Sequence, residues 1–297
     1  MPASETNNTL TLLSPAKLNL FLHITGRRAD GYHNLQTLFQ LLDYGDSLSF
    51  RLDEGEGIAL HSNNGRIPMD ANLIILAADK LRHFAEMLAK DKGMDSPNFS
   101  AVEITLDKRL PMGAGLGGGS ANAATTLLAL NQLWQLNFSK ATLAQIGLSL
   151  GADIPLFILG KSAWAEGVGE ILQAIELPQR HYLVLTPHCE ISTVEIFSHQ
   201  QLTRDSSAIR MADFLDQLES NWIEQHCRND CQKVSAMLYP EVDEALKWLH
   251  QYAPSRMTGT GASVFASFST EQAAQEVLQN LPDNMSGFVA KGINSLE

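Results

Sequence analysis

The sequence is poor in cysteine and in positive charge. It has three cysteines, an odd and small number that cannot form a disulfide framework, and free thiols fit a reducing compartment. Lys and Arg number 21 against 33 Asp and Glu, which gives a net charge of −12. General nucleic-acid binding needs an excess of Lys and Arg, so we expect no nucleic-acid partner. A local phosphate site built from backbone N–H groups remains open, because it needs no charged side chain.

Long hydrophobic runs are also missing. The longest, such as residues 73–78, are far shorter than the roughly 18 residues that a membrane span needs. The N-terminal residues have no basic stretch followed by an apolar core, as a signal peptide would. We therefore expect a cytoplasmic protein with no membrane partner, and the oligomeric state is left open.

The 297 residues contain 44% hydrophobic side chains, which is enough for a sizeable core and fits one large or two ordinary domains. Strands and helices alternate without regular βαβ spacing, which favours a two-domain α+β enzyme. We place the boundary near Gly160, between domains 1–160 and 161–297. Predicted strands cover 9–13, 17–22, 47–52, 102–106, 182–185, 258–268 and 288–290; predicted helices cover 72–88 (with Asp70 as a cap), 121–136, 140–150, 211–222, 242–251 and 271–281.

A glycine-rich loop stands between the strand at 102–106 and the helix at 121–136. Five glycines fall between Gly113 and Gly119. Glycine lets the backbone approach a ligand closely, and the N–H groups of the following helix favour an anion, usually phosphate. A flexible linker is the simpler alternative, but the flanking strand and helix argue against it.

Three well-known phosphate loops do not fit this segment. A Walker A loop needs a Lys before its Ser, and Gly118-Gly119-Ser120 has none. A dinucleotide-binding fold needs an acidic residue about 20 residues later, yet none occurs between Asp107 and Asp153. The H-R-D and D-F-G motifs of protein kinases are absent from the sequence.

Three motifs in family order resemble the GHMP kinases, which include galactokinase, homoserine kinase and mevalonate kinase. The motifs are PAKLNL at 15–20, PMGAGLGGGSA at 111–121 and GTGAS at 259–263. The resemblance implies an N-terminal ATP-binding domain, a C-terminal ferredoxin-like α/β domain, and ATP with Mg²⁺ as cofactors. It also implies that ATP is bound by Pro111, Met112, Gly113, Ala114, Gly115, Leu116, Gly117, Gly118, Gly119, Ser120 and Ala121.

One departure from the family concerns the metal. Several GHMP kinases carry a Ser pair after Gly-Leu-Gly, where this sequence has Gly118 and Gly119 with Ser120 one step later. Mg²⁺ is still expected, because it neutralises the β- and γ-phosphates, but we assign it no protein ligand.

Asp153 and Lys17 are the candidate catalytic residues. Asp153 is the only acid between Asp107 and Glu166, and its apolar neighbours would make its carboxylate a stronger base. From the residues alone, Asp153 fits a turn or cap, and Lys17 fits a snorkelling edge residue. The resemblance implies instead that Asp153 takes the hydroxyl proton and that Lys17 is its electrostatic partner. Asn19 projects from the same strand face as Lys17 and is a second hydrogen-bonding candidate.

Four further segments resemble one branch of the family, whose members phosphorylate the C2 hydroxyl of a cytidyl diphosphate substrate. The resemblance places Tyr32 and His33 at the cytosine, with Phe197 as the second stacking face and Thr193 nearby. Without it, a core Tyr beside a surface His is the simpler interpretation. The alternatives are a GHMP kinase for another small alcohol, such as homoserine or mevalonate, and a non-catalytic relative. The segments are GRRADGYHN at 26–34, LLDYGD at 41–46, GADIPLF at 151–157 and AEGVGE at 165–170.

Two other features have simpler explanations. Cys227 and Cys231 lie beside His226, but no second pair of ligands lies at a suitable distance for zinc. The acidic stretch at 43–56 is interpreted as a solvated loop. A resident metal site is therefore left unassigned.

Overall fold

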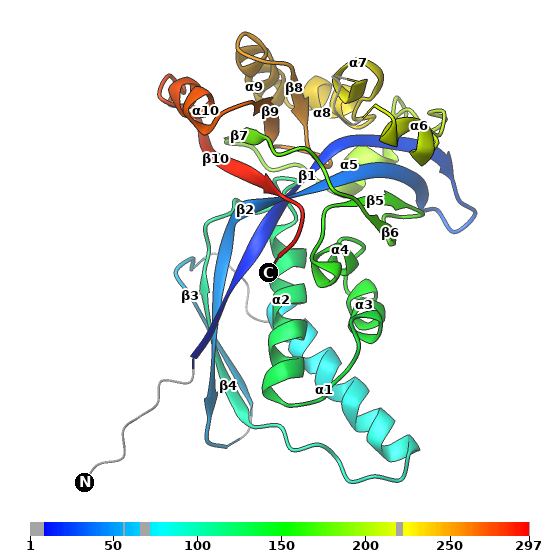
Figure 1. Cartoon of the computed structure of the whole chain (residues 1–297), viewed down its shortest axis with the longest axis vertical. Coiled ribbons are helices and arrows are strands. Elements are labelled where there is room, and N and C mark those ends of the chain that lie inside the picture. Colours follow the sequence, from blue (N-terminus) through cyan, green and yellow to red (C-terminus); the bar gives the residue numbers. More distant parts are fainter. Residues whose placement is uncertain (1–8, 56, 66–71, 218–221, 297) are drawn as a thin grey trace. The chain divides into compact units, whose positions relative to one another are not determined.

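The computed structural model describes residues 9–55, 57–65, 72–217 and 222–296. Contacts divide the chain into two compact units (Figure 1). Unit 1 comprises the described residues of Met1–Ser14, Gly45–Leu110 and Gly118–Leu159, and unit 2 comprises Pro15–Tyr44, Pro111–Gly117 and the described residues of Gly160–Glu297. The chain enters unit 2 at Gly160, but two earlier segments also belong to that unit. The division into domains 1–160 and 161–297 stays a prediction. It divides the chain at one point, whereas each of these units is built from three separate segments of the chain.

Unit 1 combines a small sheet with four helices. In the sheet, β4 (Ala101–Asp107) pairs antiparallel with the second half of β2 (His33–Asp53) and parallel with β3 (Ile58–Ser62). Helix α1 (Leu73–Asp91) packs on α2 (Gly118–Leu133), and α4 (Ile154–Leu159) packs on α2 and on α3 (Lys140–Leu148). Helix α2 buries most of its residues, which is why its sequence is apolar on nearly every side.

Unit 2 contains an antiparallel sheet in the order β10-β7-β9-β8, built from β7 (His181–Pro187), β8 (Ser255–Met257), β9 (Val264–Phe268) and β10 (Met285–Ile293). Helices α8 (Gln232–Leu238) and α9 (Pro240–His250) lie between β7 and β8 in sequence, and α10 (Glu271–Leu278) lies between β9 and β10. This β-α-β-β-α-β order is the ferredoxin-like arrangement that the family resemblance implies. Together with the helices and sheet of unit 1, it confirms the expected α+β class.

The remaining elements of unit 2 are shorter, apart from one long strand that both units share. Strand β1 (Thr9–Arg27) pairs with β2, and the first half of β2 pairs antiparallel with β5 (Ala163–Glu166), which also pairs with β6 (Ile171–Ala174). Three short helices follow in the chain: α5 (Thr193–Ser198), α6 (Met211–Leu215) and α7 (Trp222–His226).

Several predicted boundaries are wrong. The strands predicted at 9–13 and 17–22 form one strand, β1, in which every side chain from Ser14 to Ile24 is buried. Helix α2 begins at Gly118 and not at 121, and helix α4 was not expected. Helix α1 is capped by Asn72, whose side chain accepts a hydrogen bond from the N–H of Ile74. The proposed cap Asp70 and residues 218–221 of the predicted helix at 211–222 lie outside the described residues.

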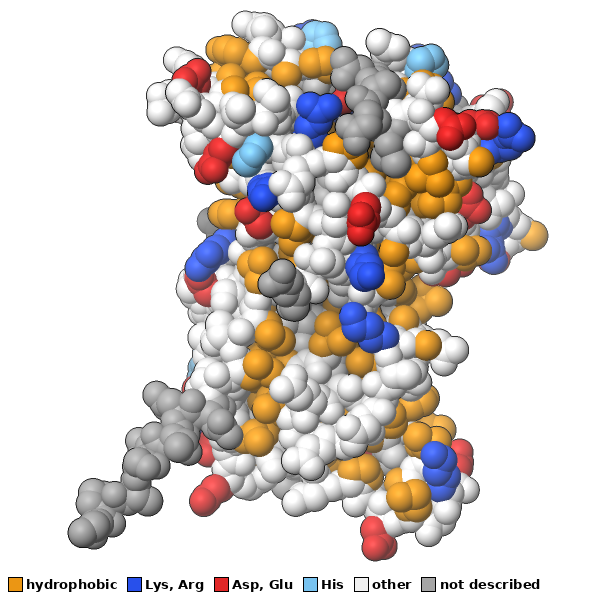
Figure 2. Space-filling model, in the orientation of Figure 1, with side chains coloured by type: hydrophobic (Ala, Val, Ile, Leu, Met, Phe, Trp, Pro, Cys, Tyr) orange, Lys and Arg blue, Asp and Glu red, His pale blue; other side chains and the backbone are white. Residues whose placement is uncertain are grey.

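Charges of both signs are interspersed on the face drawn in Figure 2. Blue Lys and Arg side chains lie next to red Asp and Glu side chains over the part of the chain that is described. Surface ion pairs of this kind, such as Asp243 with Lys247 on α9, contribute at most about 1 kcal/mol each. The stability of the fold therefore depends mainly on its apolar core.

Candidate active site

The first part of the glycine loop, Pro111–Gly117, belongs to unit 2 and is held by its carbonyl groups. Ala114 O accepts a hydrogen bond from the N–H of Ser263 (3.1 Å), and Leu116 O accepts one from the N–H of Lys17 (2.9 Å). Thr258 Oγ1 donates to Gly115 O (3.2 Å). Within the described residues, no N–H of Met112–Gly117 donates a hydrogen bond. A loop that uses its carbonyls internally and leaves its N–H groups free is suited to binding an anion.

The structure shows why residue 115 of this loop is a glycine. Its φ is +76°, in the left-handed region. A Cβ built at this position would lie 2.3 Å from Thr258 O and 3.1 Å from Gly261 O. The loop therefore packs backbone to backbone against residues 258–261, which belong to the third sequence motif of the family.

The second part of the glycine loop begins helix α2 in unit 1. Gly118, Gly119, Ser120 and Ala121 form the first turn, whose N–H groups have no partner within the helix. This turn contains no acidic residue. A Cβ at Gly118 would lie 3.1 Å from Lys108 Nζ, so a cation stands next to the start of the helix. The helix dipole and this ammonium group both favour an anion there.

Asp46 fixes the strand end that leads into the glycine loop. It is fully buried and accepts hydrogen bonds from Lys108 Nζ (2.6 Å) and from the N–H groups of Arg109 and Leu110 (2.8 Å each). The interpretation of residues 43–56 as a solvated loop is therefore wrong, because Asp46 lies within β2 and serves as a buried acceptor. Sequence analysis missed Asp46 and Lys108 because a charge run does not reveal which members are buried.

We expect Asp46→Asn to lower the free energy of unfolding by about 1.5–3 kcal/mol, since it removes a charge-assisted hydrogen bond to a buried ammonium group. Urea denaturation followed by circular dichroism would measure this change. Asp243→Asn on α9 is the matched control, because its pair with Lys247 is exposed and should contribute little to stability. Equal effects of the two substitutions would contradict the structural role of Asp46.

Lys17 and Asn19 form the centre of a buried polar network in unit 2. Lys17 is 3% exposed, its Nζ donates to Asn19 Oδ1 (2.6 Å), and it lies over the ring of Phe39 (5.4 Å). Asn19 Nδ2 donates to Thr37 Oγ1 (2.9 Å), and the N–H of Asn19 donates to Thr258 Oγ1 (3.0 Å). These bonds fix the Asn19 amide with its oxygen towards Lys17. The burial of Lys17 excludes the snorkelling interpretation.

Asp153 lies in unit 1, directly before α4. Its side chain is partly buried and has an interaction partner, and the residues that follow it, Ile154–Ile158, are buried. The buried helix holds the backbone at Asp153 in place. Since Lys17 belongs to unit 2 and Asp153 to unit 1, their pairing stays a prediction.

The residues predicted to bind the base all belong to unit 2. The rings of His33 and Phe197 lie 5.3 Å apart at an angle of 31°. Tyr32 precedes His33 and is 66% exposed, and Thr193 Oγ1 hydrogen-bonds with Thr260 Oγ1 (3.0 Å). Burial, followed by the nearby cations Arg204 and Arg27, lowers the pKa of His33, so its imidazole stays neutral at pH 7. The structure thus brings His33 and Phe197 together, and the exposed ring of Tyr32 is next to His33 in the chain.

Two family models match the chain. They are described as the GHMP kinases N-terminal domain, at residues 72–161, and the GHMP kinases C-terminal domain, at residues 211–287. The chain belongs to the GHMP kinase family. GHMP kinases use ATP as the phosphate donor and transfer phosphate to an alcohol group.

Relatives of this GHMP kinase have more specific names. A 4-diphosphocytidyl-2-C-methyl-D-erythritol kinase of Hahella chejuensis is 52% identical over 97% of this chain and 95% of the relative, and one of Marinobacter nauticus is 50% identical over 96% and 94%. A crystal structure of 4-(cytidine 5'-diphospho)-2C-methyl-D-erythritol kinase is similar with a TM-score of 0.76 and 28% identity, covering 95% of this chain and 99% of that one. A mevalonate kinase at 14% identity (TM-score 0.66) shows the shared fold alone.

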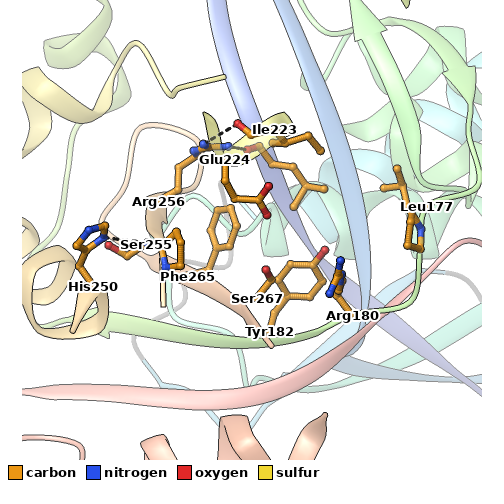
Figure 3. A pocket seen from close by; sticks show the side chains of 13 residues that line it. Leu177, Arg180, Tyr182, Ile223, Glu224, His250, Ser255, Arg256, Phe265 and Ser267 are labelled. Atoms are coloured by element: carbon orange, nitrogen blue, oxygen red, sulfur yellow. Dashed lines mark hydrogen bonds between the residues drawn. The ribbon is translucent and has the colours of Figure 1, made fainter. Parts of the chain in front are cut away.

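A cavity of about 170 Å³ in unit 2 of this GHMP kinase lies outside the predicted site (Figure 3). Arg256 lines it, but its guanidinium donates to the carbonyls of Leu20, Ile223 (3.1 Å) and Cys227 (2.7 Å). These carbonyls use much of its donor capacity, so Arg256 has a structural role in joining β1, β8 and α7.

Two of the three cysteines of this GHMP kinase, Cys227 and Cys231, are buried thiols. Burial raises the pKa of Cys227 and of Cys231 to about 12, so both stay protonated at pH 7. Among the residues that the structure describes, no group of three or more His, Cys, Asp and Glu could hold a metal ion. In the same part of the chain, no helix is long and apolar enough to cross a membrane.

Proposed function

We propose that this GHMP kinase transfers the γ-phosphoryl group of ATP to the C2 hydroxyl of 4-diphosphocytidyl-2-C-methyl-D-erythritol, in the non-mevalonate route to isoprenoid precursors. The observation that carries the proposal is the tilted ring contact between His33 and Phe197, which gives unit 2 an aromatic face beside a hydrogen-bonding edge. A nucleotide base needs both, and a small alcohol without a base needs neither. The names of relatives with about 50% identity support the same substrate.

In the proposed mechanism, the protein aligns the reactants and balances charge, because phosphoryl transfer requires little covalent chemistry from the enzyme. Asp153 accepts the proton of the C2 hydroxyl as the hydroxyl oxygen attacks the γ-phosphorus. Lys17 supplies positive charge next to the acceptor hydroxyl and to the transferred phosphoryl group. Asn19 directs the Lys17 ammonium group through the 2.6 Å hydrogen bond to its Oδ1.

ATP is proposed to bind at the residues 111–121. The free N–H groups of Met112–Gly117 support a phosphate position there, and the first turn of α2 with Lys108 supports a second. Mg²⁺ would neutralise the β- and γ-phosphates. It commonly takes most of its ligands from phosphates and water, and we assign it no ligand in this chain. We infer a cytoplasmic location from the free thiols, which fit a reducing compartment.

A coupled assay of ATP consumption with a panel of alcohols tests the function. The panel contains the cytidyl substrate, homoserine, mevalonate and a plain polyol. We expect turnover with the cytidyl substrate alone. Equal turnover with homoserine, mevalonate or the polyol would identify a kinase for another small alcohol.

Phe197→Ala tests the stacking face. Loss of stacking on a base costs about 1–3 kcal/mol, so we expect the KM for the cytidyl substrate to rise roughly ten- to a hundredfold. The KM for ATP should change little, because Phe197 is proposed to contact the cytosine and not ATP. Steady-state kinetics with each substrate varied in turn would measure both values. An unchanged KM for the cytidyl substrate would remove Phe197 from the base site.

A further inference from the structure

Arg204 connects the two sides of the predicted base site. Its Nε donates a hydrogen bond to His33 Nε2 (3.1 Å). Its Nη2 donates to the carbonyls of Phe197 and His199 (2.9 Å each), and its Nη1 donates to Leu202 O (3.1 Å). Sequence analysis gave Arg204 no role, because it lies 171 residues from His33.

In the hydrogen bond between Arg204 and His33, only Arg204 can be the donor. An Arg guanidinium has five donors and no acceptor, and it stays protonated in proteins. His33 Nε2 must therefore accept, which requires an unprotonated Nε2. A neutral imidazole with an unprotonated Nε2 carries its proton on Nδ1. Within the described residues, His33 Nδ1 makes no hydrogen bond, so this N–H donor is left for a ligand.

The surroundings of His33 favour its neutral form over the imidazolium. Burial disfavours the imidazolium, and the positive charges of Arg204 and Arg27 disfavour it further, so the pKa of His33 is lowered. His33 is 8% exposed, and its ring packs on Phe197. The neutral Nδ1–H form therefore persists through the physiological pH range.

We propose that Arg204 is a positioning residue that fixes His33 as an Nδ1–H donor and thereby selects a base whose ring nitrogen accepts a hydrogen bond. The inference rests on the proposed function. Cytosine N3 is an unprotonated acceptor, whereas uracil N3 carries a proton and would place one donor against another. A polar site rejects a ligand that leaves its buried groups unpaired far better than it rejects a small change of size.

Arg204 also positions the stacking face. Phe197 lies in the last turn of α5, and the guanidinium binds its carbonyl and that of His199, just after the helix ends. A cation there satisfies carbonyls that have no partner in the helix. One side chain thus places both the aromatic ring and the hydrogen-bond donor that would read the base.

The tautomer can be measured directly in the full-length protein without substrate. Nitrogen-15 NMR of protein labelled at histidine distinguishes a protonated ring nitrogen from an unprotonated one, and the spectrum of His33→Gln identifies the signals of His33. We expect His33 to be neutral with the proton on Nδ1. A wild-type protein with the proton on Nε2 would overturn the proposal, whatever the enzymatic activity.

Arg204→Met tests the consequence for binding. Calorimetric titration between pH 5.5 and 8.5 would compare the cytidyl substrate with its uridyl analogue. In the wild type, Nδ1 keeps its proton across this range, so the Kd of the cytidyl substrate should be nearly constant. Without Arg204, the pKa of His33 rises towards its ordinary value, and above that pKa the neutral ring can place its proton on either nitrogen.

We therefore expect the Kd of the cytidyl substrate for Arg204→Met to rise roughly three- to tenfold as the pH increases through the pKa of His33. The preference over the uridyl analogue should fall by a similar factor at high pH. Arg210→Met is the matched control, because Arg210 is exposed and, among the described residues, pairs only with Asp213. If Arg204→Met only displaced Phe197, the Kd of the cytidyl substrate would rise equally at every pH. That result would overturn the proposed role of Arg204 in base selection.

The two proposals fail in different ways. If the wild type has the Nδ1–H tautomer but phosphorylates no cytidyl substrate, the proposed function is wrong and the assignment of the tautomer stands. If the cytidyl substrate is phosphorylated and the uridyl analogue binds equally well, the function stands and Arg204 does not select the base.

Discussion

Replacing Asp153 by asparagine is expected to lower kcat about 10²–10⁴-fold, the usual contribution of a well-placed general base. Asparagine has the same shape but does not accept a proton at neutral pH. The buried helix α4 directly after Asp153 should hold the backbone unchanged. The Kd values of ATP and the cytidyl substrate should therefore stay near those of the wild type. Single-turnover kinetics and calorimetry would measure the two effects separately.

The control for this substitution is Asp79→Asn, which changes an exposed carboxylate on α1 in the same unit. It should leave kcat within about twofold, since a surface substitution away from the site has little effect. If Asp153→Asn retained kcat within a few-fold of the wild type, Asp153 would have no part in proton transfer.

Gly115→Val is expected to weaken ATP binding about a hundredfold or more. A Cβ at Gly115 would lie 2.3 Å from Thr258 O, so the valine must push the loop at 111–117 away from residues 258–261. The displaced loop would lose its N–H···phosphate hydrogen bonds, each of which contributes about 1.5–3 kcal/mol when the acceptor is charged. Calorimetric titration of ATP, on protein shown to be folded by circular dichroism, would measure the loss.

Gly93→Val separates this effect from backbone strain. Gly93 has a φ of +65°, close to the +76° of Gly115, but a Cβ there would meet nothing within 4 Å. Both variants carry the cost of a valine in the left-handed region, and only Gly115→Val disturbs the loop. Comparable ATP affinities for the two folded variants would show that the loop at 111–117 does not bind the phosphates.

Local patterns in the sequence predict much of the fold and the loop. The glycine loop is recognisable because its glycines are adjacent and its flanking strand alternates polar and apolar residues. The ferredoxin-like arrangement came from the family resemblance and not from spacing. The division into two strands at 9–13 and 17–22 was wrong, because local preferences are overridden when both faces of a strand are buried.

The polar contacts that hold the site were out of reach of sequence reasoning. Asn19 and Thr258 are 239 residues apart, and Asp46 and Lys108 are 62 apart. No periodicity connects such pairs, because each depends on how the strands are paired. For the same reason the sequence gave no sign of Arg204, although the family resemblance had placed His33 and Phe197 at one base site.

The hydrogen bonds that the carbonyl groups of the loop at 111–117 accept would affect the entropy of nucleotide binding at this loop. Fixing the backbone of one residue costs about 1–2 kcal/mol in conformational entropy. In this kinase the loop is fixed by Ser263, Lys17 and Thr258 before any nucleotide arrives, so that loss occurs when the chain folds. If ATP binds here as proposed, it would meet a preorganised surface, and its association would require no slow ordering of the loop.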